Sequence, residues 1–326
     1  MQSKKPLRKI LYVGMRYDYG RPEQGTSFEY NNFYRTLIRM VTSVVEFDFM
    51  TIMQREGKER MNALLVEKAV RENPDLIFCV LFTDEIERKT IDRLSTQWTT
   101  FNWFCDDHWR FDTFSKYFAP HFHFVSTTDH GALEKYHAIG YSTVFLTQWA
   151  CNHFEYTKYD DAVKTFDVSF VGQPHGTRKR TVSSLAKHGI MIETFGKGWR
   201  NGRITQAQMI RIFNATKINL NLANSSWNLH TIFRNQQQIK GRNFEVPGCG
   251  SFLLTNYVEG LEQYYDLENE IRCFSSLHNL RELILYYLRH EDERERIARN
   301  GYQRTLRDHT YERRFMDLFY NMGFQL

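Results

Sequence analysis

The sequence DVSFVGQPHGTRKR, residues 167–180, passes from an apolar strand pattern into the start of a helix. The strand pattern ends at Gly172, a short loop follows, and the cations Arg178, Lys179 and Arg180 open the next segment. A strand that ends at a glycine and leads into a helix through a short loop is the repeating unit of a doubly wound sheet. This stretch therefore predicts an α/β fold.

The same alternation of strand and helix runs on both sides of this stretch and indicates βαβ units with parallel sheets. In the first half we expect strands at 9–14, 44–52, 75–82, 99–104, 121–126 and 143–147, and helices at 27–40, 58–71, 84–94 and 129–139. After a polar linker at 152–165 we expect strands at 167–172, 190–195, 217–222, 251–255 and 270–274, helices that begin near residues 178, 205, 236 and 258, and closing helices at 277–290, 291–306 and 310–320.

Length and composition are those of an ordinary globular protein. The chain has 326 residues, of which 42% are apolar and 25% charged, and this predicts two domains. No apolar run approaches the roughly 20 residues of a membrane-spanning helix. The five cysteines are widely spaced and form no C-x-x-C pair, so neither a zinc site nor a disulfide framework is suggested. We therefore expect a cytoplasmic protein.

Charge is unevenly distributed along the chain. Residues 1–150 hold 19 basic and 19 acidic side chains, whereas residues 160–250 hold 13 basic and 5 acidic ones. A local positive excess attracts anions, either nucleotide phosphates or a nucleic-acid backbone. Charge alone does not choose between these two partners.

Two loops after predicted strands carry residues suited to a nucleotide. Arg178 and Lys179 stand at a helix N-terminus, where cations are mildly unfavourable unless an anion binds there, although a solvated basic helix start is the alternative. Further along, Gly196 and Lys197 lead to Trp199, whose ring offers a face for a nucleotide base. A tight turn with a packing tryptophan explains that second loop equally well.

Two more loops of the second half add polar candidates. Asn224 lies in a loop of amides and hydroxyls after a strand, where it could bond to a base or ribose, or serve a plain turn. Arg242 and Glu245 share one helix face just before a glycine-rich helix end. Such a pair is often a structural salt bridge, but a carboxylate also suits a ribose diol and an arginine suits a diphosphate.

In the first half, one strand ends in a concentration of ionisable groups. Asp106, Asp107 and His108 follow the strand pattern at 99–104. They could supply a base or orient an acceptor hydroxyl. A divalent metal or simple capping chemistry are the alternatives, but the aspartates are adjacent rather than spaced as D-x-D, so we expect no metal site here.

Taken together, these segments resemble the CgeB-like glycosyltransferases, a branch of the GT-B glycosyltransferases. The likeness covers most of the chain and is strongest in four segments: FNWFCDDHW at 101–109, DVSFVG with the later Arg178, FEVPGCGSFLLT at 244–255, and ERERIARNGYQRTLRDHTYER at 293–313. Their order and spacing carry the resemblance, because each segment alone is weak.

The resemblance implies a GT-B fold of two Rossmann-like doubly wound domains that face each other across a cleft. It implies an acceptor domain at 1–150, a domain at 151–308 that binds the nucleotide-sugar donor, and a helix at 309–326 that crosses back to the first domain. It also implies that no metal or other cofactor is needed and that the anomeric configuration is retained.

The resemblance further assigns roles to individual residues. Glu245 fits the ribose-binding second position of the family's E-x7-E pair, but the first position holds Gln237, which leaves the sugar contact open. Arg242 fits the arginine on the diphosphate. The donor-binding residues that we expect from the loops and the resemblance are Gly14, Gly172, Arg178, Lys179, Gly196, Lys197, Trp199, Asn224, Arg242, Phe244 and Glu245.

The predicted activity is transfer of a sugar from a nucleoside-diphosphate donor, with a UDP-sugar favoured, to a hydroxyl of a glycan, protein or small molecule. Two alternatives stay open at this point. One is a glycosyltransferase that acts on DNA bases, which the basic second half allows. The other is a non-catalytic nucleotide-sugar-binding protein, which Gln237 allows.

Overall fold

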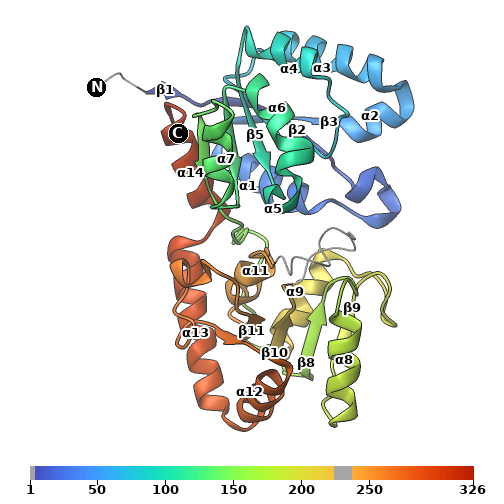
Figure 1. The fold of residues 1–326 in the computed structure, drawn as a ribbon, viewed down its shortest axis with the longest axis vertical. Helices are drawn as coiled ribbons and strands as arrows, with labels where there is room; N and C mark the ends of the chain where they lie inside the picture. The colour runs from blue at the N-terminus through green and yellow to red at the C-terminus, as the bar shows by residue number, and fades with distance from the viewer. Residues whose placement is uncertain (1–3, 224–236) are drawn as a thin grey trace. The chain divides into compact units, whose positions relative to one another are not determined.

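The computed structural model describes residues 4–223 and 237–326, and the chain divides into two compact units. The first unit consists of Met1–Gln148 with Tyr311–Leu326, and the second of Trp149–Thr310. Each unit is built around its own parallel sheet with helices packed against it (Figure 1).

The sheet of the first unit has six parallel strands in the order β3-β2-β4-β5-β6-β7. Their bounds are β2 Lys9–Gly14, β3 Ser43–Asp48, β4 Leu76–Cys79, β5 Thr99–Phe104, β6 Phe124–Thr127 and β7 Val144–Leu146. Val13 lies opposite Cys79, which lies opposite Asn102, so the three central strands end at one edge of the sheet. That carboxyl edge is where ligands bind on such sheets.

Helices and short helical turns connect these strands. They are η1 Asp18–Gly20, η2 Pro22–Gln24, the π-helix η3 Tyr30–Tyr34, α1 Arg35–Met40, α2 Phe49–Glu56, α3 Lys58–Glu72, α4 Arg88–Ser95, α5 Asp107–Arg110, the π-helix η4 Phe111–Ser115, α6 Lys116–Phe118, η5 Ala119–His121 and α7 Ala132–Ala138. The π-helix η3 leads into α1, and η4 follows α5 directly; π-helical turns are often found at functional sites.

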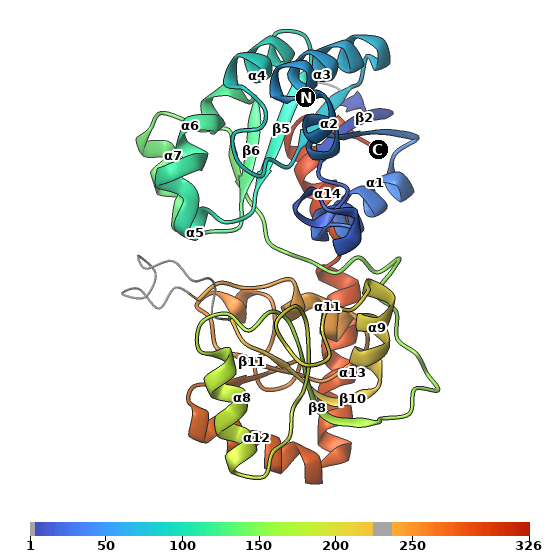
Figure 2. The ribbon, with the colours of Figure 1, turned by 90° about the vertical axis from the view of Figure 1, so that its right-hand side faces the viewer.

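The last helix of the chain, α14 (Tyr311–Asn321), belongs to the first unit and lies beside α1 (Figure 2). Its Phe315 packs against Phe33 of η3 and Trp103 of β5, with ring centroids 5.7 and 6.1 Å apart. Full burial of such a side chain contributes about 1.5–3 kcal/mol. A short parallel pair of strands, β1 (Lys5–Pro6) and β13 (Phe324–Gln325), joins the two chain ends in this unit.

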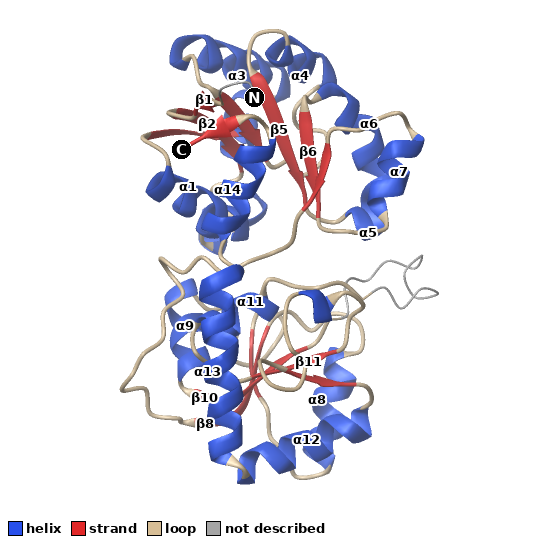
Figure 3. Ribbon diagram, turned by 90° about the vertical axis from the view of Figure 1, so that its left-hand side faces the viewer, coloured by secondary structure: helices blue, strands red, loops and turns tan. Residues whose placement is uncertain are grey.

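The sheet of the second unit has five parallel strands in the order β12-β11-β10-β8-β9. Figure 3 shows these strands with helices packed around them. The strands are β8 Phe166–Val171, β9 Glu193–Phe195, β10 Thr216–Asn221, β11 Leu253–Asn256 and β12 Arg272–Phe274; the helices are α8 Arg178–Lys187, α9 Gln206–Asn214, α11 Arg242–Gly248, η6 Leu261–Gln263, α12 Leu277–Arg289 and α13 Glu291–Asp308.

Some elements differ from the sequence-based expectation, and for two of them the reason is local. The strand expected at 44–52 ends at Asp48, because that carboxylate accepts the backbone N–H of Thr51 at 3.3 Å and caps α2. The helix expected from residue 258 is only the short η6, since Gly260 before it has a left-handed φ of 88°. The start expected near residue 236 lies outside the described residues, and α11 begins at Arg242.

Among the residues that the structure describes, none of the helices combines the length and apolarity needed to cross a membrane.

Candidate functional site

In the second unit, the loops after β8 and β9 are joined at their backbones. The N–H of Gly172 donates to the carbonyl of Phe195 at 2.9 Å, and Nε1 of Trp199 donates to the carbonyl of Gly172 at 2.7 Å. Gly196 has a φ of 133°, and a methyl group there would lie 2.5 Å from the Gly172 carbonyl oxygen. Only glycine fits at this close approach.

The structure places Trp199 as a packing residue of this turn. Its ring meets that of Phe170 edge-on, with centroids 6.1 Å apart, and its nitrogen is bonded to Gly172. The N–H of Gly172 is likewise engaged within the turn. The two glycines and the tryptophan therefore shape the loop.

Arg178, the first residue of α8, ties the loops after β8 and β10 together. Its guanidinium donates to the carbonyls of Gln173 and Leu222 at 2.8 and 2.6 Å, and the side chain is buried. Burial, together with the smaller effect of the Arg242 charge, lowers the pKa of Arg178 to about 10. The cation expected from the sequence thus stands at the carboxyl edge of the sheet.

Arg242 and the fully buried Glu245, both of α11, form an ion pair at the same edge. Nη1 of Arg242 bonds to Oε2 of Glu245, whose other oxygen accepts the Tyr156 hydroxyl at 2.7 Å. Burial by itself lowers the pKa of Arg242, but the nearby Glu245 carboxylate raises it by more, so the pKa of Arg242 lies above its ordinary value. Nε of Arg242 also reaches the carbonyl of Val171, the last residue of β8, at 3.4 Å.

Two basic residues that the sequence reasoning missed, His175 and Lys240, lie near these arginines. Burial lowers the pKa of His175, and the charges of Arg178 and Lys240 add to that effect. His175 stands in the loop after β8, and Lys240 lies two residues before Arg242. In the sequence, only their positions, just after a predicted strand and just before a helix, could have indicated these two residues. Four basic side chains, which we call the cationic edge, thus gather here: His175, Arg178, Lys240 and Arg242.

The remaining donor candidates lie elsewhere. Lys179 and Lys197 are exposed, and Gly14 ends β2 of the first unit. Phe244 is fully buried, and its ring packs against Tyr264, Tyr265 and His309, which orients it to the core. Asn224 lies outside the described residues, whereas the half-buried Gln237 lies within them.

In the first unit, Asp107 points into the core. Its two oxygens accept the hydroxyls of Ser115 at 2.5 Å and Tyr136 at 2.8 Å. Burial raises its pKa, and the hydroxyl donors act in the opposite direction. A buried carboxyl group whose two oxygens both accept hydroxyl hydrogen bonds has its hydrogen-bonding needs met within the unit.

Asp106 and His108 remain at the carboxyl edge of the first unit. Asp106 directly precedes α5, and Nε2 of His108 lies 3.9 Å from Oδ1 of Asp129. The structure therefore separates the three adjacent candidates into one buried residue and two at the edge. Within residues 4–223 and 237–326, no three His, Cys, Asp or Glu side chains are placed to hold a metal ion.

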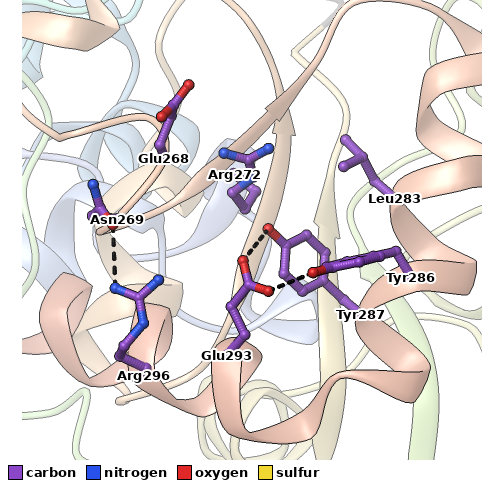
Figure 4. Close-up of a pocket in the computed structure, with 8 residues that line it drawn as sticks. All are labelled: Glu268, Asn269, Arg272, Leu283, Tyr286, Tyr287, Glu293 and Arg296. Carbon is purple, nitrogen blue, oxygen red and sulfur yellow. Dashed lines mark hydrogen bonds between the residues drawn. The ribbon is translucent and has the colours of Figure 1, made fainter.

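A cavity of about 350 Å³ opens at the other end of the second unit's sheet (Figure 4). Its wall includes Arg272, the first residue of β12, and Glu293, which accepts the hydroxyl of Tyr286 at 2.7 Å. Arg296 donates to Asn269 at 3.2 Å on the opposite side. This cavity lies at the amino end of its strand and is separate from the cationic edge.

Comparisons with known proteins concern the fold. Residues 178–319 match the family described as glycosyl transferase-like. No curated protein matches the sequence. Sucrose-phosphate synthase from Thermosynechococcus elongatus is similar in structure, with a TM-score of 0.66 and 9% identity over 97% of this chain and 98% of that one.

Two further solved structures are similar over almost their full length. HepE from Anabaena, in complex with UDP and glucose, has a TM-score of 0.63 at 10% identity and covers 95% of this chain and 98% of its own. A glycosyltransferase from Rickettsia africae has a TM-score of 0.58 at 8% identity, with 98% and 97% covered. At such low identities the likeness establishes the fold, which is GT-B.

Proposed function

We propose that this chain, a glycosyltransferase of the GT-B type, transfers a sugar from a nucleoside-diphosphate donor to a hydroxyl acceptor. A UDP-sugar is the favoured donor, and the Anabaena relative, whose structure holds UDP and glucose, supports that choice. We assign the donor to the second unit and the acceptor to the first. The proposal includes membership of the CgeB-like branch, a cytoplasmic location, metal independence and retention of configuration.

The observation that carries this proposal is the cationic edge. As the bond between the sugar and the diphosphate breaks, negative charge grows on the leaving group. Preorganised positive groups aimed at that charge are usually the largest catalytic contribution. Arg242 is fixed by Glu245 and by the end of β8, and Arg178 is fixed by two carbonyls, so neither has to be ordered when the donor binds.

These cations also explain how the reaction would proceed without a metal ion. A guanidinium donates two parallel N–H groups to phosphate oxygens. It also stays positively charged at every pH near neutrality. Glu245 is held against Arg242 and Tyr156, so it would reach a ribose only by exchanging one of these partners. We therefore assign Glu245 first to the orientation of Arg242 and second to the ribose.

Binding of UDP-glucose to the wild type and two variants tests the donor site. Arg242→Lys keeps the charge beside Glu245 but loses the planar fork, so we expect affinity to fall at least about tenfold. Lys187→Gln, at the exposed far end of α8, is the matched control and should bind normally. Titration calorimetry measures both. No binding of any nucleotide sugar by the wild type, or equal binding by Arg242→Lys, would contradict the proposal.

Metal independence and stereochemistry have their own readouts. Transfer should proceed at an unchanged rate in excess EDTA, and NMR of the first product should show the donor's anomeric configuration. A rate that EDTA abolishes and Mg²⁺ or Mn²⁺ restores, or an inverted product, would remove the corresponding part of the proposal.

A further inference from the structure

The cavity of about 350 Å³ in the second unit is lined by charges of both signs (Figure 4). Its wall holds two arginines and two glutamates: Arg272, Arg296, Glu268 and Glu293. Among the residues that the structure describes, none of these four side chains forms an ion pair. Charged groups that line one cavity without an ionic partner are the groups with which a protein recognises a charged ligand.

Arg272 supplies a group that binds anions. Its backbone is paired with Leu254 of β11, so the sheet fixes the start of the side chain. Its Nε is buried and has no hydrogen-bond partner within the described part of the chain, and its guanidinium carbon lies 5.9 Å from the ring centre of Tyr287. A buried N–H group without an acceptor is rare in native proteins, and a carboxylate accepts parallel bonds from a guanidinium.

Glu293 supplies a group that binds cations. Its two oxygens accept the hydroxyls of Tyr286 at 2.7 Å and Tyr287 at 3.5 Å (Figure 4). Both phenols are neutral, so they satisfy hydrogen bonds of the carboxylate without balancing its charge. An ammonium group brings a full positive charge and three donors, and it complements such a carboxylate.

Tyr287 connects these two charged groups. Its ring lies beside the Arg272 guanidinium, and its hydroxyl bonds to Glu293. Burial raises the pKa of Tyr287 to about 12, an effect that the Arg272 charge opposes and the Glu293 charge enhances. The cation and the carboxylate therefore stand near one phenol, yet they form no ion pair with each other among the contacts of the described residues.

Another side of the cavity is a turn that the fold already holds in place. Asp266 accepts the N–H groups of Glu268 and Asn269 at 2.9 and 3.0 Å. Asn300 of α13 donates to the Asn269 carbonyl at 3.0 Å, and Arg296 of the same helix donates to the Asn269 side chain at 3.2 Å. A wall that is ordered before binding lowers the entropic cost of taking up a ligand.

We propose that this cavity binds a small zwitterion, namely an α-amino acid with an apolar side chain. The carboxylate of the amino acid bonds to Arg272, and its ammonium group bonds to Glu293. The apolar side chain lies against Leu283 and the ring of Tyr286, which also line the cavity. The inference is independent of the proposed function, because the cavity is separate from the cationic edge.

The balance of charges selects a zwitterion over a singly charged ligand. An anion such as phosphate would meet Glu268 and Glu293 as well as the arginines, and an amine would meet both arginines as well as the glutamates. A ligand that carries both signs gains from each group and is repelled by neither. Pockets for small molecules usually measure roughly 300–1,000 Å³, so this cavity suits a compact ligand.

The experiment titrates the whole chain with four probes and measures binding by calorimetry and ligand-observed NMR. L-Leucine is the zwitterion. Isocaproate is leucine without its ammonium group, isoamylamine is leucine without its carboxylate, and inorganic phosphate is a simple anion. The melting temperature and the affinity for UDP-glucose are measured for every variant, so that a folding defect or a donor defect is recognised.

Two variants change the cavity, and two serve as matched controls. Arg272→Gln and Glu293→Gln remove one charge each and keep hydrogen-bonding groups of similar size. Arg289→Gln and Asp292→Asn remove the same charges from exposed positions at the end of α12 and the start of α13, outside the cavity wall.

The wild type and both controls should bind L-leucine, and each of the other three probes should bind at least about tenfold more weakly. Arg272→Gln and Glu293→Gln should each lower the affinity for leucine at least about tenfold, with the affinity for UDP-glucose unchanged. Arg272→Gln should also reduce the advantage of leucine over isoamylamine, and Glu293→Gln its advantage over isocaproate. A residue that only supports the fold would not change these two ratios separately.

Four results would overturn the inference. The first is a wild type that does not bind leucine, and the second is isocaproate, isoamylamine or phosphate binding as tightly as leucine. The third is normal leucine binding by folded Arg272→Gln or Glu293→Gln. The fourth is a loss of UDP-glucose binding in folded Arg272→Gln, because the cavity would then belong to the donor site.

Discussion

The two sheets share one architecture but gather opposite charges at their carboxyl edges. In the second unit the charge of Arg242 acts on Arg178, and in the first the charges of Asp18 and Asp106 act on Glu29, the residue before η3. The pKa shifts mirror each other, since burial and a like charge lower that of Arg178 to about 10 and raise that of Glu29 to about 7. The fold places a ligand-binding edge on each sheet, and the charged residues at that edge determine which ligand can bind there.

Each edge brings charges of one sign close together. Like charges in a half-buried place repel each other, and burial removes the water that would screen them. A diphosphate would relieve the cationic edge, and a proton would relieve the acidic one. This difference is why we assign the anionic donor to one unit and the hydroxyl acceptor to the other.

The largest expected effect concerns the ion pair of the cationic edge. Arg242→Gln leaves the fully buried Glu245 without its cation, and we expect the free energy of unfolding to fall by about 3–5 kcal/mol. The double variant Arg242→Gln/Glu245→Gln removes both charges and should recover most of that loss. Urea denaturation measures both.

Binding of UDP-glucose distinguishes the structural role of the Arg242 and Glu245 pair from its role in phosphate binding. The double variant should fold well and still fail to bind UDP-glucose, because stability and phosphate binding depend on different properties of Arg242. A double variant that binds the donor normally would show that the cationic edge is structural, and the contrast between the two edges would lose its functional meaning.

The next effect concerns the loop that shapes the cationic edge. Gly196→Ala combines a φ of 133° with a clash against the Gly172 carbonyl, and we expect a loss of about 3 kcal/mol. Gly189→Ala has a φ of 78° and open space around it, so it reports the backbone cost alone, about 1 kcal/mol. Thermal unfolding of the two variants gives the difference, and equal losses would show that the loop yields without strain.

At the acidic edge, Asp107 is expected to behave as a structural residue. Asp107→Ala leaves the hydroxyls of Ser115 and Tyr136 without an acceptor and should cost about 2 kcal/mol. Asp107→Asn retains a carbonyl oxygen and should cost less. Turnover per folded molecule should stay near the wild-type rate in both. A large loss of turnover in well-folded Asp107→Asn would return this residue to the catalytic group.

The smallest effect is the pH dependence of stability at Glu29. Its folded pKa of about 7 lies above the ordinary value of 4.5, so the folded protein holds the proton more tightly than the unfolded chain. Stability therefore falls as pH rises from about 4.5 to 7. Denaturation curves across this range should show a flatter profile for Glu29→Gln than for the wild type. An identical slope in the two proteins would mean that Glu29 titrates normally.

Much of the fold was predictable from the sequence because strands and helices have different periods. The strands at Lys9–Gly14 and Thr99–Phe104 have the expected bounds. The prediction of a strand after Asp48 was wrong. Phe49 to Ile52 suits a strand as well as a helix, and the Asp48 carboxylate, which caps α2, makes this segment helical. Helices α5 and α6 were missed because their aromatic residues follow no simple period.

The candidate site was less predictable, because it depends on contacts between distant segments. Sequence cannot tell which of the adjacent Asp106 and Asp107 turns inward, since the partners of Asp107 lie 8 and 29 residues further along. Glu29 became visible only when the fold brought it to Asp106. The Arg242 and Glu245 pair was readable from its spacing on one helix face, but the burial that fixes it was not.

The most direct test of the account is a crystal structure of the protein with UDP. The account predicts that the phosphate oxygens lie within about 3 Å of the Arg242 guanidinium, at the carboxyl edge of the second unit's sheet. Phosphates held instead by Arg272 and Arg296 in the cavity of Figure 4, at the amino end of β12, would contradict it.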